Sequence, residues 1–254
     1  MIEVGYERRD RIAYITLNRP EAKNAVTPEM HDELCRLWAN FRDDDQADVA
    51  ILTGVDDAFC AGADLATYVP RNYVDAPPSR VREIVDLGFG GLTRGLHRIT
   101  KPTIAAVNGW ALAGGCGLAT ACDIVIAAES ARFGYPEVKI GFVPAMVMAI
   151  LRRNIGEKIA FELSTQGFEF SAERALELGL VNHVYDDNEF DQRVAEYVSV
   201  YTKVSSSAER LTKQLLYKMD GSNFEKAVLA GAETNAEARM TDDCKKGTAK
   251  FLEK

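Results

Sequence analysis

The sequence predicts an α/β core followed by a segment built of helices alone. Short runs rich in Val, Ile and Ala alternate with helical patterns through the first part of the chain, as expected for a sheet covered by helices. After about residue 190 the strand patterns stop and only helical periodicity continues. We therefore expect a core over residues 1–195 and a helical subdomain over residues 196–254.

Four apolar segments predict the strands of this core. Each is short, apolar and rich in β-branched or small residues, and each is bounded by polar residues, Gly or Pro. Such segments are typical of strands buried inside an α/β sheet. They occupy residues 12–17, 49–53, 103–107 and 124–128.

Helices are predicted between and after these strands. Thr27 followed by Pro28 is typical of an N-cap and a first helical position, and the apolar residues from Met30 to Phe41 recur at helical spacing. The apolar, Gly-rich residues 112–122 predict a buried helix. Residues 66–82 hold three prolines and several charges, so we expect a mobile loop that could close over a ligand. The C-terminal helices are expected at residues 190–201, 207–219, 223–238 and 242–254.

Composition restricts the class of function. The chain has 254 residues, 47% of them hydrophobic, and a net charge of −8, so it can bury a core but lacks the basic face that general nucleic-acid or anionic-membrane binding needs. No apolar run is long enough to span a membrane. The five cysteines include no CxxC pair, which argues against disulfides and a metal site and favours a reducing, cytoplasmic compartment. Cys116 and Cys122 are expected to be small buried hydrophobes.

The first segment with possible chemistry is Ala61-Gly62-Ala63-Asp64-Leu65, directly after the predicted strand at 49–53 and a short turn. Small side chains here let backbone N–H groups approach a ligand closely. A tight strand-to-helix turn is the alternative explanation.

The second segment runs from Asn108 to Gly117 and opens the predicted buried helix. A helix N-terminus presents unpaired N–H donors and partial positive charge, so Gly114 and its neighbours could stabilise an oxyanion. The glycine spacing fits neither a phosphate loop nor a dinucleotide fingerprint. Close helix packing through small residues is an equally good structural explanation.

The third segment, residues 133–144, contains Glu137 within an apolar run. Desolvation would raise the pKa of this carboxyl towards neutrality and suit it to acid/base chemistry. Alternatively, Glu137 pairs with Lys139 or caps a turn.

Taken in order, these motifs resemble the crotonase superfamily, the enoyl-CoA hydratase/isomerase family. The resemblance extends over nearly the whole chain and includes the three segments above, Asn18-Arg19-Pro20, Lys101-Pro102 and the stretch 175–181. It implies repeated ββα units wound into a spiral, with C-terminal helices that mediate trimers or dimers of trimers. The implied partner is an acyl-CoA thioester, with no separate cofactor and no metal.

The resemblance also implies roles for particular residues. The backbone N–H groups of Ala63 and Gly114 would hold the thioester oxygen, and Glu137 would transfer protons. The remaining implied contacts to the thioester and CoA belong to Ala22, Lys23, Ala61, Gly62, Asp64, Leu65 and Gly115.

Position 117 departs from the two-glutamate hydratases, because Gly117 stands where they carry a second Glu. One carboxylate suits a Δ3,Δ2-enoyl-CoA isomerase, in which a single Glu moves the proton. The neighbourhood also resembles a methylglutaconyl-CoA-type hydratase branch with a small residue there. We expect a hydratase, with an isomerase as the alternative and a non-catalytic, RNA-binding member as a remote one.

Several other side chains carry weaker expectations. Tyr68 and Tyr73 could face an acyl group, and Phe142 and Met146 could shape its pocket. His31 is expected at the surface or an interface, and His97 and His183 have no metal-ligand spacing partner. Basic groups of the last helix could reach CoA phosphates: Lys245, Lys246, Lys250 and Lys254.

Overall fold

The computed structural model describes residues 2–72 and 77–253. Its larger sheet has the strand order β1-β2-β3-β5-β7-β10. β1 runs antiparallel to β2, and the other neighbours are parallel. The strands are β1 Val4–Arg9, β2 Ile12–Leu17, β3 Val49–Gly54, β5 Thr103–Val107, β7 Ile124–Ala128 and β10 His183–Tyr185.

A smaller sheet has the order β4-β6-β8-β9, with β4, β6 and β8 parallel and β9 antiparallel. Three successive strand pairs each send their first strand to the larger sheet and their second to the smaller one: β3 and β4, β5 and β6, β7 and β8. The chain thus winds through the two sheets in repeated turns, and the predicted ββα spiral is confirmed. The strands are β4 Ala58–Cys60, β6 Trp110–Leu112, β8 Arg132–Gly134 and β9 Glu169–Ser171.

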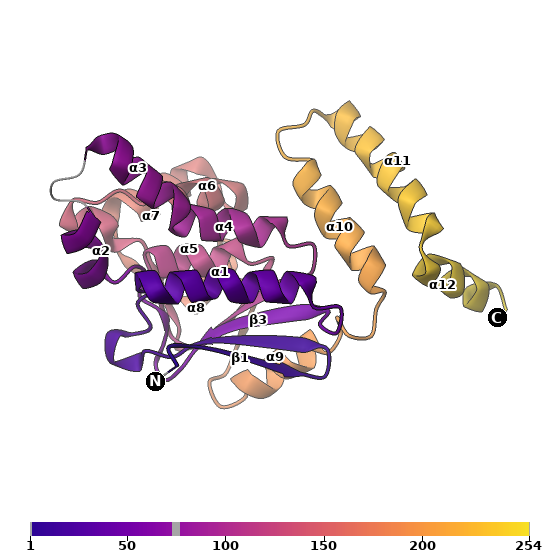
Figure 1. The fold of residues 1–254 in the computed structure, drawn as a ribbon, viewed down its shortest axis with the longest axis horizontal. Helices are drawn as coiled ribbons and strands as arrows, with labels where there is room; N and C mark the ends of the chain where they lie inside the picture. Colours follow the sequence, from indigo (N-terminus) through magenta and orange to yellow (C-terminus); the bar gives the residue numbers. More distant parts are fainter. Residues whose placement is uncertain (1, 73–76, 254) are drawn as a thin grey trace.

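The core helices cover both faces of the larger sheet (Figure 1). α1 and α4 pack on one face, where their side chains join the main hydrophobic cluster, and α9 covers the other face over a second cluster. As predicted, the Thr27 side chain caps α1 by accepting a hydrogen bond from the Met30 N–H at 3.1 Å. These helices are α1 Pro28–Asp43, α4 Phe89–Arg98, α5 Gly114–Ala121, α6 Ala145–Asn154, α7 Glu157–Gln166, α8 Ala172–Glu177 and α9 Phe190–Val198, with 3₁₀ turns η1 Pro20–Ala22 and η2 Pro136–Ile140.

All four predicted strands are present as β2, β3, β5 and β7, but two other expectations were wrong. The buried helix starts at Gly114 and not at residue 112, because Trp110–Leu112 pairs with β4 and β8 as strand β6. The expected loop at 66–82 is helical in its described parts, α2 Leu65–Asn72 and α3 Pro78–Leu87. α3 begins at a proline, which a first helical position accepts without losing a hydrogen bond.

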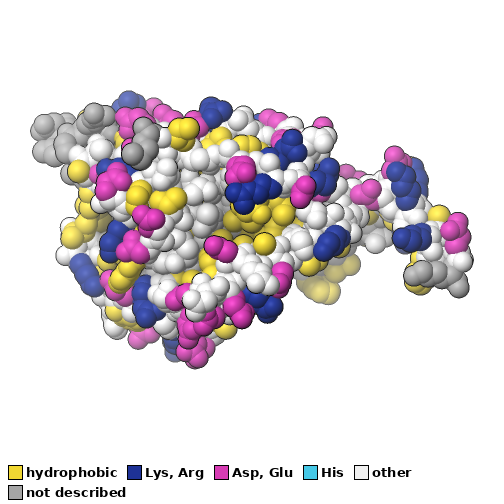
Figure 2. Space-filling view, turned by 90° about the horizontal axis from the view of Figure 1, so that it is seen from below, with side chains coloured by type: hydrophobic (Ala, Val, Ile, Leu, Met, Phe, Trp, Pro, Cys, Tyr) yellow, Lys and Arg dark blue, Asp and Glu magenta, His cyan; other side chains and the backbone are white. Residues whose placement is uncertain are grey.

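The C-terminal helices are α10 Ser206–Lys218, α11 Phe224–Met240 and α12 Asp242–Leu252, close to the predicted bounds. They form an arm that projects from the body (Figures 1 and 2). In Figure 2, hydrophobic side chains reach the surface next to the point where this arm leaves the body. The predicted boundary at residue 195 falls inside α9 and stays a prediction. Within the described ranges, no helix has the length and apolarity that a membrane span requires.

Candidate active site

A cavity of about 750 Å³ opens between α2, α3, α5, η2 and α6. Five of the ten predicted site residues line it: Ala61, Ala63, Leu65, Gly114 and Glu137. They come from three stretches separated by about 50 and 20 residues in the sequence, so the fold brings the three predicted segments together at one place.

The Ala63 segment is held in an extended conformation after β4. The Val26 N–H donates to the Gly62 carbonyl at 2.8 Å, and the Asp64 N–H donates to the Val26 carbonyl at 2.9 Å. In this parallel bridge the N–H of the intervening Ala63 points away from Val26. Ala63 also lines the cavity, and the role of its N–H as a donor to a bound ligand stays a prediction.

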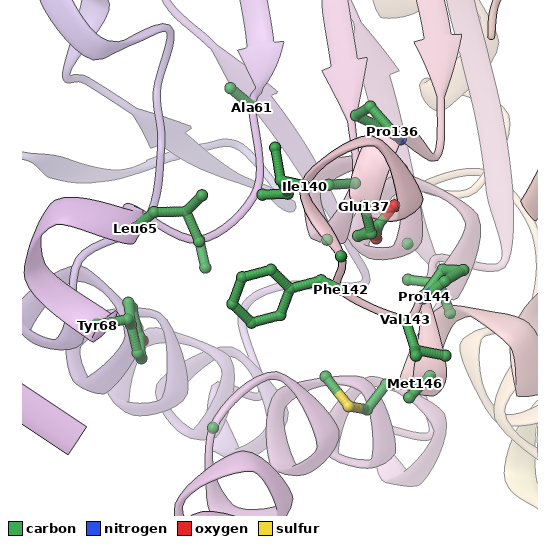
Figure 3. A pocket seen from close by; sticks show the side chains of 18 of the residues that line it. Ala61, Leu65, Tyr68, Pro136, Glu137, Ile140, Phe142, Val143, Pro144 and Met146 are labelled. Atoms are coloured by element: carbon green, nitrogen blue, oxygen red, sulfur yellow. The ribbon is translucent and has the colours of Figure 1, made fainter. Parts of the chain in front are cut away.

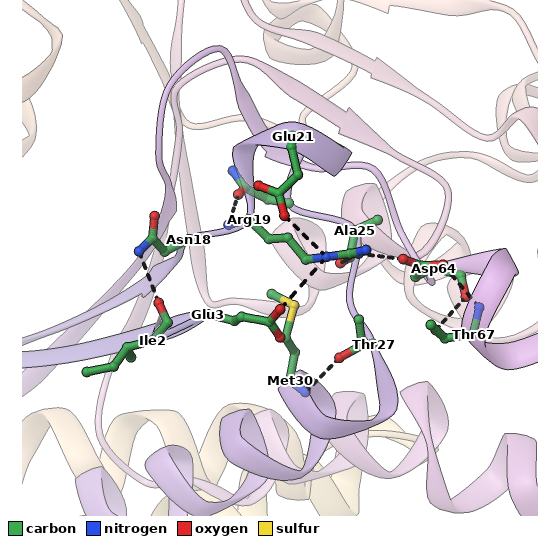
Figure 4. A network of polar contacts seen from close by, with 11 residues as sticks. Ile2, Glu3, Asn18, Arg19, Glu21, Ala25, Thr27, Met30, Asp64 and Thr67 are labelled. Atoms are coloured by element: carbon green, nitrogen blue, oxygen red, sulfur yellow. Dashed lines mark hydrogen bonds and ion pairs between the residues drawn. The ribbon is translucent and has the colours of Figure 1, made fainter.

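Arg19 ties this segment to the start of the chain (Figure 4). Its guanidinium bonds the Asp64 carboxylate and the Ala25 carbonyl and lies near Glu3 and Glu21. Burial raises the pKa of Asp64, but the Arg19 side chain and backbone donors, including the Thr67 N–H, lower it more, so its pKa lies below the usual value. The charged pair therefore holds Asp64, the residue after Ala63, against the segment that contains Arg19 and Ala25.

Gly114 is the first residue of α5, and its backbone faces the Ala63 segment. A Cβ on Gly62 would lie 3.1 Å from the Gly114 nitrogen, so the two segments are in close contact. The preceding Ala113 has φ 50° and ψ −126°, a conformation that L-residues rarely adopt, and its N–H donates to the Gly134 carbonyl at 2.9 Å. This strained position directs the chain into α5 with the Gly114 N–H exposed at the helix N-terminus.

Gly115 is needed for packing and does not line the cavity. A Cβ there would lie 2.0 Å from the Cys60 carbonyl oxygen, a distance that no side chain could occupy. The glycine thus lets α5 lie directly against the end of β4, which brings its N-terminus beside Ala63.

Glu137 is the carboxylate of the cavity. It lies in the 3₁₀ turn η2, and its Oε2 is buried with no hydrogen-bond partner. Burial raises the pKa of Glu137, and its own backbone N–H only partly offsets this effect. The alternative explanation, a pair with Lys139, has no support among the ion pairs of the described residues.

The remaining walls are mostly apolar, with Lys139 and Thr93 among the polar residues of the lining. Figure 3 shows Phe142 extending towards Leu65 and Tyr68, with Met146 and Val143 on the α6 side. The expectations that Tyr68, Phe142 and Met146 face the cavity agree with this arrangement, while Tyr73 lies outside the described residues. A large apolar space beside one desolvated carboxylate suits an acyl group whose reacting carbon needs a proton moved.

The other five predicted residues do not line the cavity. Gly62 and Asp64 support Ala63 from behind, and Gly115 packs against Cys60. Lys23 has its ammonium 4.7 Å from the centre of the Trp110 ring, while its carbonyl accepts from the Ala61 N–H at 3.0 Å. Contacts of Ala22 and Lys23 to a nucleotide stay predictions.

The histidines lie outside the cavity lining. His31 was expected at the surface or an interface; it is only 9% exposed, so the surface position is wrong and the interface stays a prediction, and Cys35 and Asp32 flank its two ring nitrogens. His97 stacks on Tyr217 and His183 on Tyr185. Cys116 and Cys122 are buried as predicted. Across residues 2–72 and 77–253, His, Cys, Asp and Glu form no cluster suited to a metal ion.

Sequence reasoning missed Arg19 and Val147 as contributors to the site. Arg19 holds the Ala63 segment, and Val147 lines the cavity next to Gly117. The available signal for Arg19 was that this charged residue stands directly before Pro20. Val147 lies in an ordinary apolar helix pattern, so only the fold reveals its position.

The ββα spiral, the two adjacent backbone segments and the Glu137 carboxylate in the cavity define a protein of the crotonase class. A family model described as enoyl-CoA hydratase/isomerase matches residues 7–254, and the chain belongs to this family.

Individual relatives agree over the full length. A mevalonyl-coenzyme A hydratase of Aspergillus fumigatus is 35% identical over 246 residues, which cover 96% of this chain and 89% of that protein. A short-chain-enoyl-CoA hydratase of Clostridium acetobutylicum is 33% identical over 250 residues, with 98% and 94% covered. The crystal structure of an enoyl-CoA hydratase of Mycobacterium smegmatis matches with a TM-score of 0.93 and 30% identity, covering 100% of this chain and 97% of that one.

Proposed function

We propose that this protein is an enoyl-CoA hydratase that adds water to a 2-enoyl thioester, or removes it, with Glu137 as the general acid/base. The observation that carries the proposal is the buried, unpartnered Oε2 of Glu137 in a cavity that Ala63 and Gly114 also line. The hydratases among its full-length relatives support water addition.

We propose that the backbone N–H donors stabilise the negative charge that develops on the thioester oxygen. A thioester carbonyl placed between the N–H groups of Ala63 and Gly114 would accept two hydrogen bonds, which strengthen as negative charge develops on the oxygen. A single donor of this kind contributes about 3 kcal/mol to transition-state stabilisation in measured cases. The partial positive charge at the α5 N-terminus adds to the effect.

Glu137 is proposed to move the protons. As a carboxylate it accepts a proton from water while the water oxygen bonds to the β-carbon and the double-bond electrons move towards the thioester oxygen. The enolate then takes a proton from the Glu137 carboxyl at the α-carbon, which regenerates the carboxylate. Burial raises the pKa of Glu137, which makes it a better base in the first step.

The isomerase alternative rests on one observation: Gly117 lines the cavity where the two-glutamate scheme has its second carboxylate. A single Glu137 could remove a proton from the α-carbon of a 3-enoyl thioester and return one at the γ-carbon. This scheme uses the same donors and needs no water.

We also propose a homotrimer, or a dimer of trimers, assembled through the C-terminal arm. Large hydrophobic side chains along α10–α12 are 60–83% exposed in the isolated chain: Leu216, Leu229, Phe224, Met240, Phe251 and Leu252. Covering them would remove apolar surface from water. No cofactor beyond the CoA of the substrate is proposed. The cytoplasm is the proposed compartment, consistent with five cysteines that are all free.

The decisive experiment incubates the purified protein with 2-enoyl- and 3-enoyl-CoA esters, including a 3-methylglutaconyl ester, and follows product mass and conjugation. A gain of one water with loss of conjugation is the expected result. Unchanged mass with the double bond moved into conjugation would replace the proposal with the isomerase. No conversion of any ester, together with RNA binding that falls steeply with salt, would favour the non-catalytic alternative.

A further inference from the structure

Gly117 and Val147 occupy one space between them. A Cβ on Gly117 would lie 2.1 Å from Cγ1 of Val147 and 3.2 Å from its Cβ. Cβ atoms essentially never lie closer than 3.0 Å to a heavy atom to which they are not bonded, and the optimal separation of two carbon atoms is about 3.5–4.0 Å. Val147 therefore excludes any side chain at position 117 unless Val147 changes its rotamer or one of the two helices shifts.

Val147 has little freedom to give way. It lies in the first turn of α6 and is 7% exposed, on the same buried face as Ile150 and Leu151. A β-branched side chain in a helix has one strongly preferred rotamer. The contact to Gly117 is therefore a fixed feature of the α5–α6 interface.

The pair lies next to the reacting end of the proposed substrate. Gly117 follows Gly114 by three residues on α5, which places it about 4.5 Å further along the helix on nearly the same face. Gly117 and Val147 both line the cavity. With the thioester oxygen at the Gly114 N–H and the α-carbon at Glu137, the β-carbon faces this part of the wall.

We propose that Val147 is a specificity-determining residue that fills the side-chain space of position 117 and limits the size of the substituent on the substrate β-carbon. This inference rests on the proposed function for its substrate, but its steric part stands independently. A second active-site Glu at position 117 of α5 would need a smaller residue at position 147 of α6. The residue on α6 therefore helps to decide whether the cavity holds one carboxylate or two.

The steric part is tested by a double-mutant cycle on stability, which needs no activity. Gly117→Ala should lower the unfolding midpoint in the Val147 background and should lower it much less in the Val147→Ala background. Additive effects of the two changes would overturn the contact. Far-ultraviolet circular dichroism of all four proteins checks that they are folded.

The specificity part is tested with 3-methyl- and 3-ethyl-2-enoyl-CoA esters. Val147→Ala should raise the ratio of kcat/KM for the ethyl over the methyl ester about tenfold, within the range for one methylene in an apolar pocket. Val194→Ala is the control, because it removes the same two methyl groups from the buried face of α9. It should leave the ethyl-to-methyl ratio of kcat/KM unchanged. An unchanged ratio in Val147→Ala would overturn the specificity role.

A gain-of-function variant separates the two helices' contributions. Gly117→Glu/Val147→Ala should hydrate an unsubstituted 2-enoyl ester at least tenfold faster than Gly117→Glu alone. Equal rates, with Gly117→Glu as stable as wild type, would show that Val147 does not exclude the carboxylate. If wild type converts no ester, the proposed function fails, whereas the stability cycle still decides the steric inference.

Discussion

Lys213 of α10 reaches back 90 residues to Asp123, with its Nζ 2.6 Å from the Asp123 Oδ2. The same ammonium donates to the Lys101 carbonyl at 2.9 Å, and the Tyr217 hydroxyl donates to the other Asp123 oxygen at 2.9 Å. Asp123 also accepts from the Thr103 N–H at the start of β5. This buried polar cluster fastens the first helix of the C-terminal arm to the strand ends of the larger sheet.

Replacing Lys213 with Met should destabilise the protein. Burial lowers the pKa of Lys213, and the nearby Asp123 carboxylate only partly offsets this, so the folded environment disfavours the charged ammonium overall. Its removal nevertheless leaves a mostly buried carboxylate with fewer donors, and we expect a loss of about 2 kcal/mol in urea unfolding. Lys218→Met, which breaks an exposed pair with Glu233, is the control and should change stability by less than about 1 kcal/mol. Equal effects of the two variants would contradict this account.

Glu137→Gln should abolish turnover and at the same time stabilise the fold at neutral pH. Loss of a general acid/base typically lowers kcat by about 10²–10⁴-fold. The folded-state pKa of Glu137 is raised by burial, so the folded protein loses stability as pH rises through that pKa. The unfolding temperature of the variant should therefore exceed that of wild type at pH 8, with a smaller difference at pH 4.5.

The same raised pKa predicts the pH dependence of the reaction. Glu137 must be ionised to accept a proton, so kcat/KM of wild type should fall as pH drops through its pKa. This acidic limb should lie above the ordinary Glu value of 4.5. A limb at or below that value, in an otherwise stable protein, would argue against Glu137 as the titrating base.

Glu209 on α10 predicts a second pH effect that involves stability alone. Its carboxylate oxygens are buried without hydrogen-bond partners, and burial together with the nearby Asp48 charge raises its pKa to about 7. The raised value means that stability falls as pH increases from about 4.5 to 7. Glu209→Gln should therefore raise the unfolding temperature at pH 8 and change it little at pH 4.5, and exposed Glu225→Gln should change it at neither.

Arg19→Ala should lower activity, although Arg19 is not proposed to contact the substrate. Without the guanidinium, the Asp64 carboxylate and the Ala25 carbonyl lose their hydrogen bonds to Arg19, so the backbone next to Ala63 is held less firmly. A donor misplaced by about 1 Å can lower the rate by up to 10²-fold. We expect kcat to fall about tenfold or more while the fold is retained. Arg36→Ala, which removes an exposed pair with Glu33, is the matched control, and equal kcat values for the two variants would remove the positioning role.

The sequence predicted the elements with strong local patterns and missed those defined by distant partners. Four of the six strands of the larger sheet were recognisable as short apolar runs; all five residues of β5, for example, are buried, and four of them are apolar. The strands β4, β6 and β8 have three residues each, too few for a periodicity, and they exist through pairing with one another. Pro77 and Pro78 were interpreted as part of a loop, but proline also fits the first turn of a helix, and α3 begins at Pro78.

The candidate site shows the same difference between residues with a local pattern and residues that act through distant partners. Glu137 and Gly114 were predicted because a lone carboxylate and a Gly-rich helix start have chemical meaning in isolation. Val147 and Arg19 act through residues 30 and 45 positions away, Gly117 and Asp64, and no local pattern shows such contacts. The burial of His31 was not predicted for a similar reason, because the face of α1 that is buried includes this histidine.

The strained backbone of Ala113 has a consequence for attempts to make this protein more heat-resistant. Glycine adopts φ 50° and ψ −126° without steric penalty, so a library selected on thermal endurance alone would tend to enrich Gly at position 113. Yet glycine also loosens the chain immediately before the α5 N-terminus. Selection for heat resistance would therefore favour Gly at position 113, whereas selection for turnover would favour keeping Ala there.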